Sequence, residues 1–373
     1  YDRESKGTER IQPAANGDWN RPYGRNKAVE QILANQISLQ GNFKTGKIKH
    51  QLFTGIDTEI SYADAYTFRF FNPDVLDVNG DPVTVTTYGN PVNIFDPALY
   101  DATYDGPIMP SEVTRIVKTE TTRLGVYAQD LISFSDKFKA LLGIRYSYQE
   151  AKPETHDKVN NTITEEKIRN DRAFSPKVGL IYQPTKSITL FSSYSNSFTP
   201  NTGIDINNEA LEPSIIDQIE AGIKNEFWKG KLTTNVTLYQ IVNSNLAQTA
   251  EFDASGNINT NPNLKALSGE TTSKGIELDI TYKPIDDLNI MAGYSYNDMR
   301  YTKTSGLNGS FIEGDRLVRT PANTANLSFF YTLQSGALKG ISLGAIGNYI
   351  GKRSGGWNDQ IVINNTTGVK TIN

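Results

Sequence analysis

Few residues of this chain could perform catalysis or hold a metal ion. Among its 373 residues there is no cysteine, and the two histidines are His50 and His156. The lack of cysteine excludes thiolate nucleophiles, thiolate metal ligands and disulfides, and two histidines nearly exclude a multi-histidine metal site. The sequence also offers no convergent set of base, nucleophile and metal ligand, so we expect that the chain is not an enzyme and has no cofactor.

One acidic segment has the composition of a cation-binding loop. Asp74, Asp77, Asn79 and Asp81 surround Gly80, in a spacing that loosely resembles a calcium loop. The spacing departs from the EF-hand pattern, and the glutamate that ends that pattern is absent. Asp, Asn and Gly are also the residues that turns favour. We therefore expect a polar turn in this segment and no calcium site.

The charge balance argues against a nucleic-acid partner. Lys and Arg number 37 and Asp and Glu number 41, so the net charge is −4 with neutral histidines. A protein that follows a phosphate backbone needs a basic surface, which this balance does not supply. The mean hydropathy is −0.46, and no window is apolar enough for a membrane helix. A transmembrane β-barrel remains open, because its strands alternate apolar and polar residues.

Strict alternation of apolar and polar residues identifies the elements. Ile276, Leu278 and Ile280 alternate with Glu277 and Asp279. The same period of two covers the segments 217–228, 233–238 and 288–297. Each such strand has one apolar and one hydrophilic face. A soluble antiparallel sheet and a membrane barrel both fit this pattern.

The lengths of the connections distinguish these two folds. Short connections are expected at 44–47, 135–137, 184–187, 229–231, 284–287 and 334–339, and long ones at about 71–111, 151–171, 199–213, 248–272, 303–316 and 352 to the end. Long loops without structure are uncommon in compact soluble domains. Regular alternation of tight turns and long loops is typical of outer-membrane barrels. The sequence therefore predicts an all-β, antiparallel, up-and-down transmembrane barrel of about twelve strands in six hairpins.

Aromatic residues are placed in agreement with this fold. Tyr182, Trp228, Tyr282 and Tyr331 are expected beside short turns, and Tyr146, Tyr148, Tyr194, Phe198, Tyr294 and Tyr296 near long loops. Two aromatic rows that border an apolar band are typical of the two membrane interfaces. Aromatic residues are also good strand formers in soluble sheets, so this pattern adds to the barrel prediction without deciding it.

An ordered set of short motifs makes the prediction more specific. The set consists of Ser175–Tyr182, Ser193–Pro200, Leu211–Ser214, Ile219–Lys224, Lys274–Leu278, Arg319–Asn323 and Gly351–Arg353, with Leu124–Asp130, Gly143–Tyr146 and His50–Asp57 upstream. In this order they resemble the barrel of TonB-dependent siderophore receptors, from about residue 28 to residue 353. Gly179, Gly222 and Gly275 fall on the polar face, where we expect a missing side chain to let the wall curve or an interior domain approach.

The resemblance implies a Gram-negative outer-membrane protein that is longer than this chain. Members have an N-terminal plug domain, a segment before it that contacts TonB, and a barrel that typically has about 22 strands. The chain opens in polar sequence at Tyr1 and stops in an expected loop at Asn373. We therefore expect residues 1–373 to be an internal part of one barrel domain. About seven strands and the plug would precede it and about three strands would follow it.

The resemblance also implies where cargo binds. In the family an iron(III)–siderophore complex lies above the plug and contacts aromatic and basic residues of the extracellular loops. The loops of this chain offer Tyr88, Tyr100, Tyr104, Arg300, Arg316, Arg319, Arg353 and Trp357. Aromatic side chains present flat faces to a chelate, and arginine neutralises an anionic complex. Exposed loop residues of these types are also common without any ligand.

Several functions fit the sequence. Import of a ferric siderophore with TonB-transduced energy is expected first, and the implied partners are the chelate, TonB and outer-membrane lipid. The same fold could serve another cargo, such as cobalamin, haem or an oligosaccharide. A passive porin and a soluble β-rich adhesin are the remaining alternatives. The segment Asn261-Pro262-Asn263-Leu264 resembles a haem-receptor signature, but its position and the lack of a suitable histidine favour a turn.

Overall fold

The computed structural model describes residues 2–8, 14–19, 22–87, 92–96, 109–250, 252–257, 259, 261, 264–356, 358–363 and 369–372. The chain forms two compact units. The first comprises Tyr1–Gln36, Asp57–Leu124 and Tyr148–Asn170, and the second comprises Ile37–Ile56, Gly125–Ser147 and Asp171–Asn373. Five long strands contribute residues to both units, and each unit is described by itself below.

The described residues form strands and turns and contain no helix. The long strands are β3 (Tyr23–Thr45), β4 (Ile48–Leu76), β7 (Ser111–Ser133), β8 (Phe138–Asp157), β10 (Arg169–Thr185), β11 (Ile188–Thr199), β12 (Ser214–Phe227), β13 (Leu232–Thr249), β14 (Lys265–Tyr282), β15 (Leu288–Lys303), β16 (Asn323–Thr332) and β17 (Ser342–Ile350). The short strands are β1 (Asp2–Thr8), β2 (Asp18–Trp19), β5 (Pro82–Val85), β6 (Val92–Asn93), β9 (Thr162–Glu165), β18 (Ile361–Ile363) and β19 (Lys370–Ile372). No helix long and apolar enough to span a membrane therefore occurs in this part of the chain.

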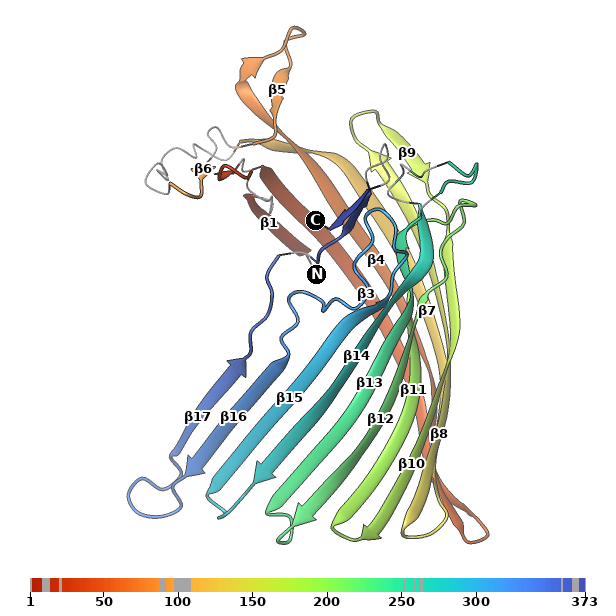
Figure 1. Ribbon diagram of the computed structural model, residues 1–373, viewed down its shortest axis with the longest axis vertical. Coiled ribbons are helices and arrows are strands. Elements are labelled where there is room, and N and C mark those ends of the chain that lie inside the picture. The colour runs from red at the N-terminus through yellow and green to blue at the C-terminus, as the bar shows by residue number, and fades with distance from the viewer. Residues whose placement is uncertain are drawn as a thin grey trace. The chain divides into compact units, whose positions relative to one another are not determined.

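The long strands follow one another in a single sheet (Figure 1). Its order is β1-β3-β4-β7-β8-β10-β11-β12-β13-β14-β15-β16-β17, with β5 beside β4 and β9 beside β8. From β10 to β17 each strand pairs antiparallel with the next in the chain. All six expected short connections occur as turns between paired strands of the second unit. The prediction of an antiparallel, up-and-down sheet is confirmed.

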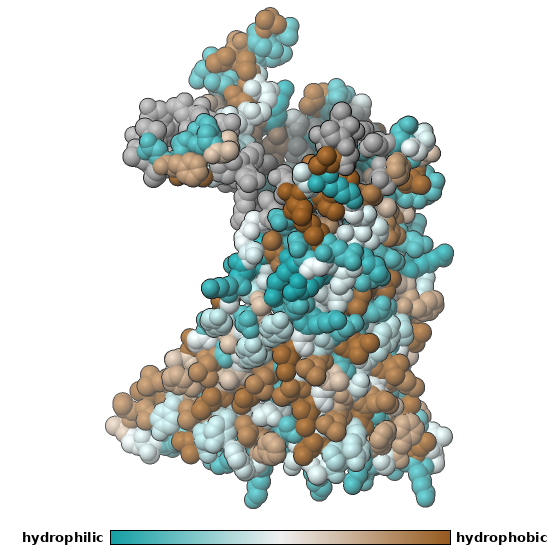
Figure 2. Space-filling model, viewed as in Figure 1, coloured by the Kyte–Doolittle hydropathy of each residue, from teal (hydrophilic) through white to brown (hydrophobic). Residues whose placement is uncertain are grey.

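Cross-strand pairing places the two sequence parities on opposite faces. One row pairs residues across seven strands in the order Leu190, Ile223, Val236, Leu278, Tyr294, Ala325 and Tyr349. The adjacent row, on the other face, pairs Thr189, Lys224, Asn235, Asp279, Gly293, Asn326 and Asn348. On the face visible in Figure 2, hydrophobic residues gather toward the short turns, and hydrophilic residues prevail farther from them. The sheet thus has an apolar face and a polar face, as expected.

Tyrosines on the apolar face are anchored by bonds to the neighbouring strand. The Tyr194 hydroxyl donates to Asp217 Oδ1 at 2.6 Å, and the Tyr294 hydroxyl donates to Asn323 Oδ1 at 2.7 Å. Tyr194 lies in the half of β11 that is farther from the short turn, and Tyr294 lies near the middle of β15. Near the turns, the rings of Trp228 and Tyr282 contact at 5.9 Å between centroids. This arrangement suits the two aromatic rows that the sequence predicts, because each tyrosine has an apolar ring and a polar tip.

Glycines of the polar face accommodate aromatic rings from the paired residue. A Cβ atom at Gly222 would lie 2.6 Å from the Phe191 ring, and one at Gly275 would lie 2.5 Å from the Tyr239 ring. Phe191 pairs with Gly222, and Tyr239 pairs with Gly275. The same relation joins Phe330 with Gly344. At Gly222 and Gly275, an aromatic ring of the neighbouring strand therefore fills the space that the missing side chain leaves.

Several strands are longer than the sequence indicates. β4 continues to Leu76, β8 continues to Asp157, and β14 begins at Lys265, all within segments expected to be long loops. β1 was not expected and pairs antiparallel with β3. These extensions lack a regular alternation of apolar and polar residues, so their strand conformation depends on pairing with a neighbour and not on the apolar period.

Candidate functional site

The connections at the ends opposite the short turns form one joined structure in the second unit. We name the described residues of 200–213, 250–264, 304–322 and 351–372 the loop layer. Ile204 of the first connection bridges to Leu264 of the second, and its carbonyl accepts a bond from Lys265 N at 2.7 Å. The Gln248 side chain accepts a bond from Ser305 N at 3.0 Å, which links the end of β13 to the third connection.

A small core supports the loop layer. Leu211, Ala250 and Leu264 are buried, each with no more than 8% of its surface exposed. Buried Asn201 donates from Nδ2 to the carbonyls of Glu212 and Asn245, both at 2.8 Å. Buried polar groups are stable when they are hydrogen-bonded in this way. The loop layer is therefore an ordered surface and not a set of independent loops.

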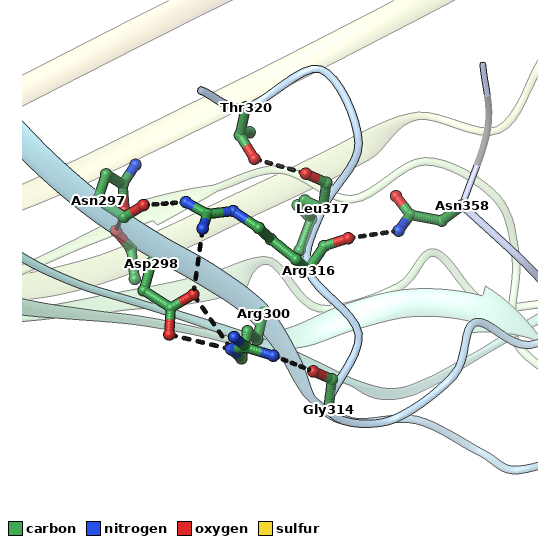
Figure 3. A network of polar contacts seen from close by, with 9 residues as sticks. Asn297, Asp298, Arg300, Gly314, Arg316, Leu317, Thr320 and Asn358 are labelled. Atoms are coloured by element: carbon green, nitrogen blue, oxygen red, sulfur yellow. Dashed lines mark hydrogen bonds and ion pairs between the residues drawn. The ribbon is translucent and has the colours of Figure 1, made fainter. Parts of the chain in front are cut away.

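Arg300, Arg316 and Asp298 form a charged cluster where β15 meets the loop layer (Figure 3). Arg300 Nε donates to Asp298 at 2.9 Å, and its NH1 donates to the carbonyl of Gly314 at 2.8 Å. Arg316 lies 3.7 Å from the same carboxylate and donates to the carbonyl of Asn297. Two guanidinium groups thus share one carboxylate.

Asn358 joins the third and fourth connections. Its Oδ1 accepts a bond from Val318 N at 3.0 Å, and its Nδ2 donates to the Arg316 carbonyl at 2.8 Å. Both polar atoms of this one side chain therefore bond to the backbone on either side of Leu317. Figure 3 shows the bond to the Arg316 carbonyl. The Arg319 backbone N–H donates to the Ser354 carbonyl at 2.9 Å, and its Nε donates to the Gly356 carbonyl at 3.1 Å.

The structure places three of the sequence-predicted ligand residues together and gives them structural bonds. Arg300, Arg316 and Arg319 all lie in or beside the loop layer, and each donates to a backbone carbonyl. Alternation along β15 puts Arg300 on the same face as Tyr294 and Tyr296. Tyr88, Tyr100, Tyr104 and Trp357 lie outside the described residues.

One aromatic pair of the loop layer was not identified from the sequence. Tyr301 at the end of β15 stacks on Phe311, with 4.6 Å between ring centroids and 18° between planes. The two residues are ten positions apart in a polar segment, and no sequence signal places their rings together. A stacked pair of this kind offers a flat face to an aromatic or chelated ligand.

The acidic segment around Gly80 is a turn. Asp77 Oδ1 accepts bonds from the backbone N–H groups of Asn79 at 2.8 Å and Asp81 at 3.0 Å. The same side chain to backbone pattern, two and four residues ahead, recurs at Asp205 and Asp253. The recurring signal is an aspartate followed two residues later by Asn or Ser and then by Gly or Asn. The prediction of a polar turn agrees with this geometry.

The Asp77 turn is expected to loosen in acid. Its backbone hydrogen bonds to Asp81 and Asn79 lower the pKa of Asp77 below the ordinary value of 3.8. A lowered folded-state pKa means that the carboxylate stabilises the turn above pH 3.8 and that this contribution disappears as the pH falls through the lowered value. Amide hydrogen exchange at Asn79 and Asp81 should therefore accelerate between pH 4 and pH 2, beyond the intrinsic change, and Asp77→Ala should abolish the difference. Protection that persists at pH 2 would contradict this role for the carboxylate.

Cavities in the described part of the chain do not present a metal site. One cavity of about 480 Å³ lies in the first unit, where Glu120, Glu154 and Glu165 line it together with Lys118 and Lys152. Lys152 pairs with Glu150 at 2.7 Å, so part of this charge is neutralised within the protein. Among the described residues, no three His, Asp or Glu side chains are placed to hold a metal ion.

Comparison with known proteins identifies related receptors. The family described as TonB dependent receptor-like, beta-barrel matches residues 2–372. The chain is 29% identical over 331 residues to the metal-pseudopaline receptor CntO of Pseudomonas aeruginosa, covering 87% of this chain and 42% of that protein. It is 29% identical over 333 residues to the ferrioxamine B receptor of Salmonella typhimurium, covering 89% of this chain and 41% of that protein.

A solved structure supports the fold. The ferric-catecholate import receptor Fiu from E. coli superposes with a TM-score of 0.70 at 17% identity, covering all of this chain and 51% of that protein. The chain spans less than half the length of the two curated receptors that it resembles. These relatives are receptors and not enzymes, in agreement with the expectation from the sequence.

Proposed function

Because this chain belongs to the TonB-dependent receptor-like β-barrel family, we propose that the complete protein binds a ferric siderophore outside the cell and imports it with energy transduced by TonB. Proteins of this family lie in the outer membrane of Gram-negative bacteria. The strands of this chain are therefore membrane-spanning, and their apolar face contacts lipid. The short turns then lie on the periplasmic side and the loop layer on the extracellular side.

The observation that carries this proposal is the joined loop layer above the strands. A cargo site needs side chains held in fixed positions, and the bonds of Asn201, Asn358 and Arg319 hold these connections together. Arg300, Arg316 and Arg319 supply cations in or beside the loop layer that would attract an anionic chelate. Three relatives with similar sequences are named as receptors or transporters for ferrioxamine B, ferrioxamine and ferrichrome, which supports a ferric siderophore as the cargo.

One relative favours a second candidate cargo. The metal-pseudopaline receptor is named for a metal complex without specifying iron. A receptor for a different metal chelate would use the same barrel and a similar basic loop surface. Binding of the purified full-length receptor to matched iron(III) and zinc(II) chelates separates the two candidates, because the preferred metal complex should quench tryptophan fluorescence at lower concentration.

Replacing Arg316, Arg319 and Trp357 together with alanine in the full-length receptor is expected to weaken binding of an anionic ferric chelate by about tenfold or more, since charge-assisted bonds contribute most at such sites. Assembly of the barrel should be unchanged, as measured by its heat-modifiable migration in gels. Asn358→Ala is the matched control, because it breaks bonds between connections and leaves every cation in place. Unchanged affinity in the triple variant would indicate that the cargo site lies in other loops or in the plug. Equal losses in the triple variant and the control would assign the arginines a structural role alone.

A further inference from the structure

A histidine and a carboxylate form a pair on the apolar face of the second unit. His50 Nδ1 lies 2.7 Å from Asp130 Oδ2, and only 15% and 22% of the two side chains are exposed. Along β4, His50 shares its parity with Leu52 and Ile56, and along β7, Asp130 shares its parity with Val126 and Ala128. Ionisable groups on a lipid-facing surface are costly, and they are usually retained for a function.

The pair lies at the level of lipid headgroups. His50 comes soon after the start of β4 at Ile48, and Asp130 comes shortly before the end of β7 at Ser133, so both are close to the periplasmic turns. The Phe43 ring stacks on His50, with 4.6 Å between centroids and 4° between planes. This stacking orients the imidazole, whose Nδ1 faces Asp130.

Asp130 has one oxygen without a protein partner. Its Oδ1 is buried and takes part in no hydrogen bond with the described residues, whereas Oδ2 contacts His50. A buried acceptor without a donor destabilises the surface that contains it. Because Oδ1 itself is buried, a donor from outside the chain would reach the carboxylate through the exposed 22% of the side chain.

An apolar groove runs beside the same carboxylate. It has a volume of about 290 Å³, and Leu52, Ala128, Leu142 and Ile144 line it together with Asp130. Leu142 and Ile144 are about half exposed, at 47% and 52%, so the groove opens toward the lipid. Its walls are aliphatic, and Asp130 is the residue with a charge among those that line it.

We propose that this groove binds one phospholipid whose headgroup carries a primary ammonium. Charge complementarity selects the headgroup, because an ammonium donates hydrogen bonds to the Asp130 carboxylate and an anionic headgroup is repelled by it. The acyl chain lies along Leu142 and Ile144, where it replaces contacts with bulk lipid. The proposal depends on the outer-membrane location and not on the identity of the cargo.

Native mass spectrometry of the full-length receptor tests the site. The receptor is transferred into mixed micelles that contain phosphatidylethanolamine, phosphatidylcholine and phosphatidylglycerol with identical acyl chains, and the retained lipid is counted. We expect one phosphatidylethanolamine to be retained about tenfold more than either other lipid, because only its headgroup combines positive charge with N–H donors. Asp130→Asn should abolish the preference, and Ala128→Phe should reduce retention by filling the groove.

Asp136→Asn is the matched control. Asp136 lies in the turn after β7 with its side chain 98% exposed, so this variant removes the same charge at the same end of the barrel. It should retain the lipid as the unmodified receptor does. Equal retention of phosphatidylcholine and phosphatidylethanolamine would overturn the proposal, since a quaternary ammonium has no N–H to donate. The proposal would also be overturned if the folded Asp130→Asn receptor still preferred phosphatidylethanolamine.

Discussion

Alanine at Gly275 is expected to destabilise the barrel by about 3 kcal/mol, at the upper end of the usual cost of overpacking. The new Cβ would lie 2.5 Å from the Tyr239 ring and closer still to the carbonyl of Tyr296. Both contacts come from the strands that flank Gly275, so the change would disturb pairing on each side. Unfolding of the full-length receptor in urea, in the presence of lipid vesicles, measures the loss.

Gly143→Ala is the control for this prediction. Gly143 lies within β8, and a Cβ there would meet Gln129 and Ala128 at 3.5–3.6 Å, which is ordinary van der Waals contact. Alanine at such a position should be neutral or slightly stabilising, because it restricts the unfolded chain. Similar free energies of unfolding for the two variants would show that the ring of Tyr239 does not depend on the glycine opposite it.

Arginine at Leu278 is expected to cost about 2–4 kcal/mol, the range for a charge on the lipid face near the middle of the membrane. Leu278 belongs to the apolar row that also contains Val236 and Tyr294. Glu277→Gln, one residue away on the polar face, should cost much less. Reversible folding into lipid vesicles measures both free energies. Equal costs at the two positions would contradict the assignment of the apolar face to lipid.

Alternation in the sequence predicts the sheet well because the apolar or polar character of each residue indicates the face of the strand on which it lies. The pairing of Leu278 with Val236 and Tyr294 follows once the apolar residues of neighbouring strands are aligned. The short turns are equally local, since they are fixed by the few residues between two alternating segments. Strand β1 and the extensions of β4 and β8 lack this period, and a single sequence therefore gives no sign of them.

The loop layer could not be predicted because its bonds join residues that are far apart in the chain. The sequence indicates Arg319 as an exposed loop cation that could contact cargo. In the structure its Nε donates to the carbonyl of Gly356, 37 residues away. The role of Asn358 could not be predicted, because an isolated asparagine in a polar segment does not indicate which backbone groups it bonds. The pairing of His50 with Asp130, 80 residues apart, was unpredictable for the same reason. Side chains that act across a sheet are recognised only when the neighbouring strands are known.

Uptake of an iron-55-labelled ferric siderophore tests the central claim most directly. The complete receptor is expressed in a Gram-negative strain that lacks its own siderophore receptors, in paired backgrounds with and without TonB. The account predicts uptake only where both the receptor and TonB are present, and loss of that uptake when a protonophore collapses the proton-motive force. Uptake that requires the receptor but persists without TonB would contradict active import and would indicate a passive pore.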